Sequence, residues 1–300
     1  MTAYCDSPAA LVLQTVDGAG NVTASLDLMD VANGYRISSL ELAWPAVREV
    51  KADLPTRDGS FDTTALFGER TVTVIGSLIT SSSGSRQAAL QNLAWWVQPS
   101  LRPRLVFAVD ADRPQMAIGL RGAQLGAPYT DRSVSAFTAS WVAPDPAAYA
   151  LTGKQIVIVP GLTTTGRTYP RTYPVTYAGT GGSGLGQANN AGTYQTWPTF
   201  TVFGPCVNPN IYYLAPATGQ VVFNAQVALN VAAGDYVVID TRAATVLYNG
   251  LAGASRYSNL DYAHTVWAPF APGTTQLRFA PTSLSAPCQF QVNWSDAYLT

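Results

Sequence analysis

The chain has 300 residues, of which 47% are hydrophobic and only 12% are charged, and its formal net charge is −1. This length fits two domains of roughly 150 residues each. The near-neutral charge excludes a basic surface large enough to bind nucleic acid through its phosphates. Charged residues are about half as frequent as in an average domain, so we expect large surfaces to be buried against neighbours in an assembly.

Segments that would direct the chain to a membrane are not evident in the sequence. No apolar run approaches the roughly 18 residues of a membrane-spanning helix. The first residues, MTAYCDSPAALVL, lack the basic and apolar regions of a signal peptide. We therefore expect no membrane insertion, and synthesis in a cytosol until an assembly carries the protein out.

The first half predicts a β domain over residues 1–152. Apolar residues alternate or cluster between turn signals, which predicts strands at 9–16, 35–42, 46–54, 69–79, 104–110, 115–124 and 133–142. Residues 54–62, LPTRDGSFD, form a loop in which Asp58-Gly59 favours a β-turn. We interpret this loop both as a turn and as an exposed subunit contact.

One helix is predicted in this half, over residues 85–97. Ala89, Leu93, Trp96 and Val97 recur at helical spacing and share one apolar face. The serines at 81–85 supply an N-cap and Pro99 ends the helix.

The second half, residues 153–300, predicts an antiparallel β-sandwich. Short strands separated by turn residues are expected at 194–203, 211–215, 220–231, 235–240, 244–248, 265–270, 275–280 and 288–296. Residues 154–190 are interpreted as a linker that leads into this domain, with a slack loop over 179–192. The segment 189–211 then begins the sandwich.

Two glycine patterns imitate nucleotide sites. Residues 161–168 (GLTTTGRT) are one substitution from a P-loop, but Pro170 and Pro174 forbid the helix that would hold phosphates. Residues 179–184 (GTGGSG) match the dinucleotide fingerprint, yet no helix follows and the next acidic residue is Asp235. Both patterns are therefore interpreted as loops, and no cofactor is predicted.

Catalytic and metal-binding residues are scarce. His264 is the single histidine and is interpreted as a strand residue, and no cluster of the zinc-binding kind is present. Asp110 and Asp112 could act as a glycosidic pair, although a turn role is favoured. The sequence therefore predicts no catalytic residues, no metal site and no enzymatic activity.

The three cysteines, Cys5, Cys206 and Cys288, are too few for a disulfide framework. Cys206 and Cys288 lie in the same half and could meet. Free buried thiols are expected, and the sequence leaves open whether these two form a pair.

Aromatic residues of the second half present two alternatives, namely core or interface packing and a platform on which sugars stack. Core or interface packing is favoured because most of them occupy alternating strand positions. The set comprises Trp197, Tyr212, Tyr213, Tyr236, Tyr248, Tyr257, Tyr262, Trp267 and Trp294.

The order of these motifs resembles the distal tail protein (Dit) family of phages with long, flexible, non-contractile tails. The motifs are the loop 54–62, the strand GERTVTVIGSLI (68–79), the helix 85–97 and the exit APDPAAY (143–149) in the first half. In the second half they are NNAGTYQTWPTFTVFGPCVNPNI (189–211), GDYVVIDTRAATVLYNG (234–250) and 270–299. The resemblance covers nearly the whole chain.

This resemblance implies a mainly β fold, with an N-terminal β-sandwich-like ring domain carrying one α-helix and a C-terminal antiparallel, galectin-like β-sandwich. It implies a structural virion component at the tail tip, assembled in the host cytoplasm. Copies would form a ring, of six subunits, that joins the tail tube to the tail-tip hub. Its partners would be itself, the tail tube protein, the hub or tail-associated protein and the tape measure protein.

We expect ring or tube contacts from two elements, the loop 57–62 and the helix 85–97. Their candidate contact residues are Arg57, Asp58, Gly59, Phe61, Asp62, Trp95 and Trp96. Two alternatives remain, a tail-tip receptor protein that binds carbohydrate and, with less support, a wall-degrading enzyme.

Overall fold

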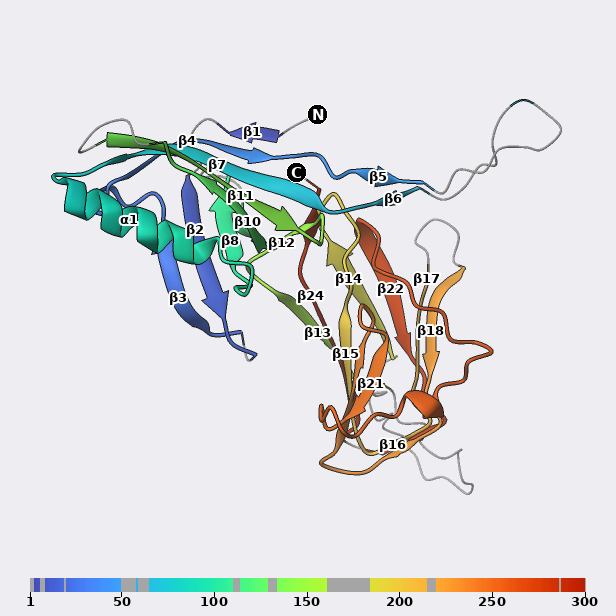
Figure 1. Ribbon diagram of the computed structural model, residues 1–300. Helices are drawn as coiled ribbons and strands as arrows, with labels where there is room; N and C mark the ends of the chain where they lie inside the picture. Colours follow the sequence, from blue (N-terminus) through green and yellow to red (C-terminus); the bar gives the residue numbers. More distant parts are fainter. Residues whose placement is uncertain are drawn as a thin grey trace, which may run out of the picture. The chain divides into compact units, whose positions relative to one another are not determined.

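The computed structural model describes residues 3–5, 9–18, 20–49, 58, 65–109, 114–128, 134–160, 184–214, 220–285 and 287–299. The chain forms two compact units (Figure 1). Unit 1 comprises Met1–Thr152 with Tyr298–Thr300, and unit 2 comprises Gly153–Ala297. The expected second domain extended to residue 300. The last residues instead belong to unit 1, because β25 (Ala297–Tyr298) joins a sheet of that unit beside β12 (Ala148–Ala150).

Unit 1 contains two main sheets and a short ribbon. The five-stranded sheet has the order β1 (Ala3–Cys5), β4 (Tyr35–Leu42), β7 (Arg70–Ile79), β11 (Val134–Ala143) and β10 (Arg121–Gly126). The six-stranded sheet has the order β25, β12, β9 (Met116–Gly119), β8 (Arg104–Ala108), β2 (Ala10–Val16) and β3 (Val22–Asp27). The ribbon pairs β5 (Val47–Arg48) with β6 (Leu66–Phe67).

The two sheets of unit 1 share one apolar core. Buried and less buried residues alternate along β7 and β11, as expected for strands with one face against a core. Val74 and Trp141 from the five-stranded sheet lie in the same cluster as Leu13 and Phe107 from the six-stranded sheet. All four side chains are fully buried, so the core of unit 1 lies between its sheets.

The helix α1 (Ser83–Trp96) packs against this core. It begins two residues before the predicted start because the Ser82 side chain accepts a hydrogen bond from the Ser85 amide at 3.1 Å and caps the helix. Leu93 and Trp96 form its buried face. The indole N–H of Trp141 donates to the Trp96 carbonyl at 3.1 Å, which fixes the end of the helix to β11.

Unit 2 also contains two main sheets. The five-stranded sheet has the order β13 (Lys154–Ile158), β24 (Gln289–Trp294), β15 (Thr199–Phe203), β20 (Tyr236–Asp240) and β21 (Thr245–Tyr248). The four-stranded sheet has the order β14 (Leu185–Asn190), β22 (Gly273–Phe279), β17 (Asn210–Leu214) and β18 (Val221–Gln226). A small sheet joins β19 (Asn230–Val231), β16 (Cys206–Val207) and β23 (Ser283–Leu284).

Phe200 lies at the centre of the core of unit 2. Its ring packs against Phe223, Phe270 and Phe290, with centroid separations of 5.3, 6.3 and 5.4 Å. These rings come from β15, β18, β24 and the segment before β22, so both main sheets contribute to a single apolar cluster. Unit 2 is thus a sandwich held together by aromatic packing.

The prediction of a mainly β chain with one α-helix is confirmed for the described residues, where the strand pairs are antiparallel.

The interpretation of 154–190 as a linker is wrong at both ends. Residues 154–158 form β13 and pair with β24, and residues 185–190 form β14 and pair with β22. Glycines beside β14 suggested a loop, but the strand gains a full ladder from its neighbour. The expected strand 265–270 is also wrong, since only isolated bridges form at Val266 and Phe270.

Candidate assembly surfaces

The ribbon of β5 and β6 continues the β4–β7 pair beyond the five-stranded sheet (Figure 1). The Ala43 amide donates to the Thr71 carbonyl at 3.0 Å, and the Gly68 amide donates to the Ala46 carbonyl at 2.6 Å. The hydrogen-bonded ladder therefore passes from the sheet into the ribbon with little interruption. A two-stranded ribbon has no second layer of its own to cover its faces.

One face of this ribbon is apolar and exposed. Val47 and Phe67 stand opposite each other in the register and so share a face. Trp44 meets the Phe67 ring edge-on, with centroids 6.0 Å apart. Trp44 is 46% exposed and Val47 is 55% exposed. We call Trp44, Val47 and Phe67 the ribbon face; it is an apolar surface of the kind that contacts a partner.

The outer face of α1 is uncharged. Its single charged residue, Arg86, is buried, and the exposed positions carry Ser, Gly, Gln, Asn, Ala and Trp95. A solvent-facing helix side ordinarily carries charges. Depletion of charge together with an exposed tryptophan is typical of surfaces that become buried in an interface.

Of the two predicted tryptophan contacts, only Trp95 is exposed, at 41%. The expectation for Trp96 is corrected, because its side chain is 2% exposed and packs inside unit 1. The two indoles meet edge to face with centroids 4.9 Å apart. Trp96 therefore packs against the inner side of Trp95, and its own side chain is too buried to contact a neighbouring subunit.

The predicted contact loop is described at one residue only. Asp58 is exposed and lies in a bend. Arg57, Gly59, Phe61 and Asp62 lie outside the described residues, so their contact role stays a prediction.

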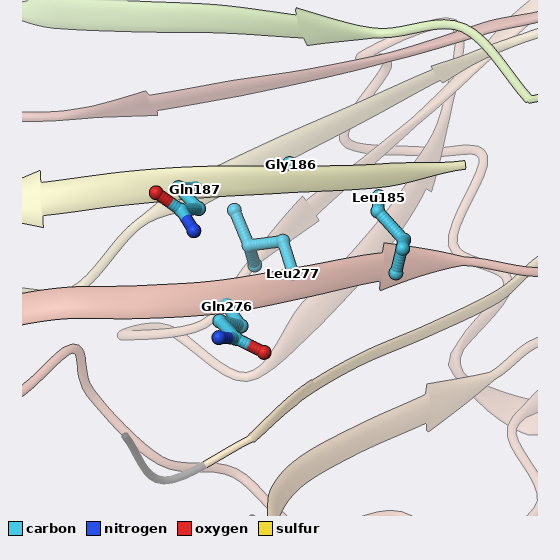
Figure 2. A pocket seen from close by; sticks show the side chains of 5 residues that line it. All are labelled: Leu185, Gly186, Gln187, Gln276 and Leu277. Atoms are coloured by element: carbon cyan, nitrogen blue, oxygen red, sulfur yellow. The ribbon is translucent and has the colours of Figure 1, made fainter. Parts of the chain in front are cut away.

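The described residues of unit 2 line surface depressions. One of 340 Å³ is lined by Leu185, Gly186, Gln187, Gln276 and Leu277 of the paired strands β14 and β22, as Figure 2 shows. Another, of 410 Å³, is lined by Thr193, Tyr194, Gln195, Val222, Ala268, Pro269, Ala271 and Pro272. Their described lining residues supply amides, hydroxyls and apolar groups but no carboxylate, histidine or thiol that could act on a substrate.

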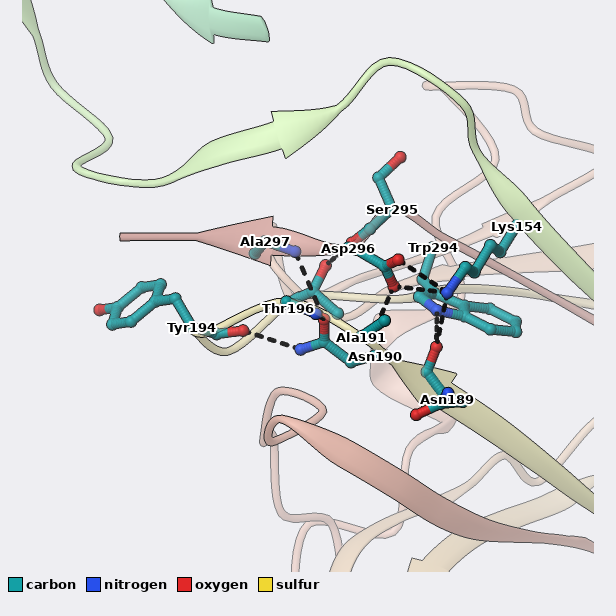
Figure 3. Close-up of polar contacts among 11 residues, drawn as sticks. Lys154, Asn189, Asn190, Ala191, Tyr194, Thr196, Trp294, Ser295, Asp296 and Ala297 are labelled. Atoms are coloured by element: carbon teal, nitrogen blue, oxygen red, sulfur yellow. Dashed lines mark hydrogen bonds and ion pairs between the residues drawn. The ribbon is translucent and has the colours of Figure 1, made fainter. Parts of the chain in front are cut away.

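A partly buried polar network, which we call the clasp, joins Lys154, Asn189, Asn190 and Asp296 of unit 2 (Figure 3). The Lys154 ammonium lies 2.7 Å from Asp296 Oδ2 and donates to the Asn189 carbonyl at 3.1 Å. The Ala191 amide donates to Asp296 Oδ1 at 3.0 Å. Because residues 154 and 296 stand near the two ends of the unit, the clasp holds these ends together and is structural.

Of the residues considered for catalysis, the structure describes His264 but neither aspartate. His264 lies in a turn and not in a strand; its side chain is 68% exposed, and its Nδ1 lies 2.7 Å from Asp261. This hydrogen bond lowers the pKa of Asp261. Asp110, Asp112 and the glycine patterns 161–168 and 179–183 lie outside the described residues. Among the residues that are described, we find no group of three His, Cys, Asp or Glu side chains placed to hold a metal ion.

The described helices include none with the length and apolar character needed to cross a bilayer.

The aromatic side chains of unit 2 divide between its core and its surface. Tyr213 and Trp294 are buried, at 2% and 7% exposure, whereas Tyr257 and Tyr262 are 39% and 61% exposed. The latter two rings meet at 5.7 Å, and the Tyr262 hydroxyl donates to the Tyr257 carbonyl at 3.0 Å. They form an exposed aromatic pair on unit 2.

Comparison with protein families now identifies the second unit. Residues 191–298 match the model of the siphovirus-type tail component, C-terminal domain. The match covers most of unit 2, and the predicted resemblance to distal tail proteins is thereby confirmed. No curated protein sequence matches the chain.

Solved structures with a similar fold include phage tail proteins. The crystal structure of SPP1 Dit (gp 19.1), described as a paradigm of hub adsorption apparatus in phages that infect Gram-positive bacteria, is similar with a TM-score of 0.62 and 13% identity. The similarity covers 96% of this chain and 99% of that one. A chain of the phage p2 baseplate in its activated conformation with Ca gives a TM-score of 0.44 at 11% identity, covering 95% and 97%. The chain therefore has a fold similar to that of SPP1 Dit along 96% of its length, and residues 191–298 of unit 2 resemble the tail-component domain.

The sequence does not predict the ribbon face. Trp44-Pro45 suggested a break between two strands, and an exposed Trp cannot be distinguished from a buried one by its neighbours in the chain. The uncharged outer face of α1 was visible in the sequence, because the segment 83–96 contains a single charged residue.

Proposed function

We propose that this chain is a distal tail protein, a structural subunit whose copies form a ring of six between the tail tube and the tail-tip hub of a long-tailed phage. The observation that carries the proposal is the tail-component match over residues 191–298, within a chain that follows the SPP1 Dit fold along 96% of its length. The proposal includes location at the tail tip and contacts with tube, hub and tape measure proteins. It includes no enzymatic activity.

A closed ring needs two different complementary patches on each subunit, one for each neighbour. Unit 1 offers two such surfaces, the ribbon face and the uncharged outer face of α1. The ribbon face exposes Trp44 and Val47, and α1 exposes Trp95. We assign these surfaces to contacts between subunits or with the tube, since tryptophan is enriched and charged residues are depleted at the centres of interfaces.

The test is the solution mass of the full chain and of matched variants by light scattering. Six copies of the 31.8 kDa chain give about 190 kDa. We expect Val47→Asp to shift the mass toward one subunit, because a carboxylate in the centre of an apolar contact would be buried without a partner. Val31→Asp is the control, since Val31 is 61% exposed and lies on the separate turn η1 (Val31–Asn33).

Assembly of Val47→Asp to the mass of the wild type would exclude the ribbon face from the interface. A wild-type chain that stays at 31.8 kDa at every concentration, and that does not co-elute with its phage's tube or hub protein, would refute the ring.

Glycan recognition at the tail tip is a second candidate function, favoured by the exposed pair Tyr257 and Tyr262. Aromatic faces supply the apolar surface on which sugar rings stack. Titration of the full chain with host-wall glycans, compared with Tyr262→Ala, tests this function. Binding that Tyr262→Ala abolishes would support it, and a flat titration of the wild type would remove it.

A further inference from the structure

Two cysteine side chains meet in the core of unit 2. Cys206 is the first residue of β16 and Cys288 immediately precedes β24; they are 2% and 3% exposed. Both belong to the single apolar cluster of unit 2. Both thiols are free, and each side chain shifts the pKa of the other.

The strand register explains why residues 82 positions apart in the sequence come together. Cys206 stands opposite Leu284 in the β16–β23 pair. The Ser285 amide donates to the Pro205 carbonyl at 3.2 Å, and the Cys288 amide donates to the Ser285 carbonyl at 2.9 Å, so the chain turns back toward β16. On the other side, Gln289 pairs with Phe203. Cys288 is thus held by backbone contacts on both sides, next to the segment that carries Cys206.

The two thiols are not chemically equivalent. The hydrogen bond with Cys288 raises the pKa of Cys206, and burial raises it further. The same bond lowers the pKa of Cys288, while burial acts in the opposite direction. The first thiolate of the pair therefore forms on Cys288, and the thiolate is the nucleophilic form of cysteine.

We propose that Cys206 and Cys288 are a site of oxidative modification, at which a small oxidant of the peroxide class joins them in a disulfide that links β16 to the start of β24. The inference does not depend on the function proposed above.

The reaction balances in two steps. The Cys288 thiolate attacks one oxygen of hydrogen peroxide and the O–O bond breaks; the leaving hydroxide takes up a proton to become water, and Cys288 becomes a sulfenic acid. The Cys206 sulfur then attacks the Cys288 sulfur, the S–O bond breaks, and a second water leaves with the Cys206 proton. Two thiols lose two electrons in total, and one peroxide is reduced to two waters.

The cross-link would constrain the unfolded chain strongly. It closes a loop that contains β17 to β23, which is most of unit 2. A disulfide across a loop of this length restricts the unfolded ensemble and so stabilises the folded state. We expect the thermal midpoint of unit 2 to rise by about 5–10 °C.

The experiment exposes the native full chain to hydrogen peroxide, quenches it, unfolds it with excess iodoacetamide and maps its peptides by mass spectrometry. We expect a cross-linked peptide pair containing Cys206 and Cys288, reversed by dithiothreitol, together with the rise in the thermal midpoint. Cys5→Ser is the matched control, because it removes the third thiol and should leave both results unchanged. Cys288→Ser should abolish both.

Recovery of Cys206 and Cys288 as separately alkylated thiols after overnight oxidation would overturn the proposal, as would cross-links that involve Cys5. If Cys288→Ser does not fold, the wild-type and Cys5→Ser chains still decide the question.

Discussion

Gly122 shows how a single missing side chain positions an element of unit 1. A Cβ atom at this position of β10 would overlap the Val97 carbonyl and would lie 2.7 Å from the Gln98 carbonyl oxygen. The end of α1 therefore approaches β10 more closely than any other residue would permit. Gly119, at the end of β9, has no atom within 4 Å of the corresponding point.

We predict that Gly122→Ala destabilises unit 1 by about 2–3 kcal/mol, since backbone atoms must move to make room. Gly119→Ala is the control and should change the free energy of unfolding by less than about 0.5 kcal/mol. Urea unfolding of both variants measures this difference. Equal stability of the two variants would show that α1 is not held against β10.

Tyr35 makes the stability of unit 1 sensitive to alkaline pH. Its side chain is 2% exposed, and its hydroxyl donates to the Ala89 carbonyl of α1 at 2.9 Å. Burial raises the pKa of Tyr35 from 10.0 to about 12. Because the folded pKa is the higher one, the contribution to stability is fully present below pH 10 and is lost as the pH rises toward 12.

We predict that Tyr35→Phe costs about 1 kcal/mol at pH 8 through the lost hydrogen bond. Between pH 10 and 12 the wild type loses roughly 2 kcal/mol that the variant does not lose. The order of stability should therefore reverse at about pH 11, where this loss exceeds the cost of the missing hydrogen bond. Urea midpoints of both proteins from pH 8 to 12 measure this, and a constant difference over that range would contradict the assigned role of Tyr35.

At the scale of elements, the clasp determines how the ends of unit 2 are held. The Asp296 side chain is 8% exposed, and Lys154, which is 36% exposed, supplies its counter-charge. Loss of one partner leaves a largely buried charge unpaired, which is costly, although the exposure of Lys154 reduces the effect.

We predict that Lys154→Met destabilises unit 2 by about 1–3 kcal/mol. Asp296→Asn should also destabilise it, but the double variant should lose clearly less than the two single variants together, because the unpaired charge is then absent. Thermal unfolding of the four proteins completes the cycle. Strictly additive losses would mean that the ion pair does not contribute to stability.

Most strands and the helix could be predicted because their signals are local. In β11 the large apolar residues Phe137 and Trp141 occupy buried positions of the alternating strand, and α1 differs from its predicted range by two residues at the start and one at the end. The strand β14 could not be predicted, because LGQANN has little apolar character and gains its order from pairing with β22. The burial of Trp96 beside an exposed Trp95 likewise depends on the fold, since Trp141 of a distant strand fixes the helix end.

At the scale of the whole molecule, the proposed assembly depends on the ribbon face and the outer face of α1. The ribbon face and the outer face of α1 are apolar or uncharged in a chain that is poor in charge throughout. An exposed apolar surface is unfavourable in water, so we expect the ribbon face to be buried against another subunit. The sequence predicted the family and the class of function, but the surface that carries Trp44 and Val47 emerged only from the paired strands of the ribbon.

Electron cryo-microscopy of the tail end of a virion that carries this chain tests the central claim most directly. We expect six copies arranged around the tail axis, between the tube and the hub, with Trp44 and Val47 buried against a neighbouring subunit. A tail end without this chain, or one that carries it only as a peripheral fibre outside the axial ring, would contradict the proposed ring.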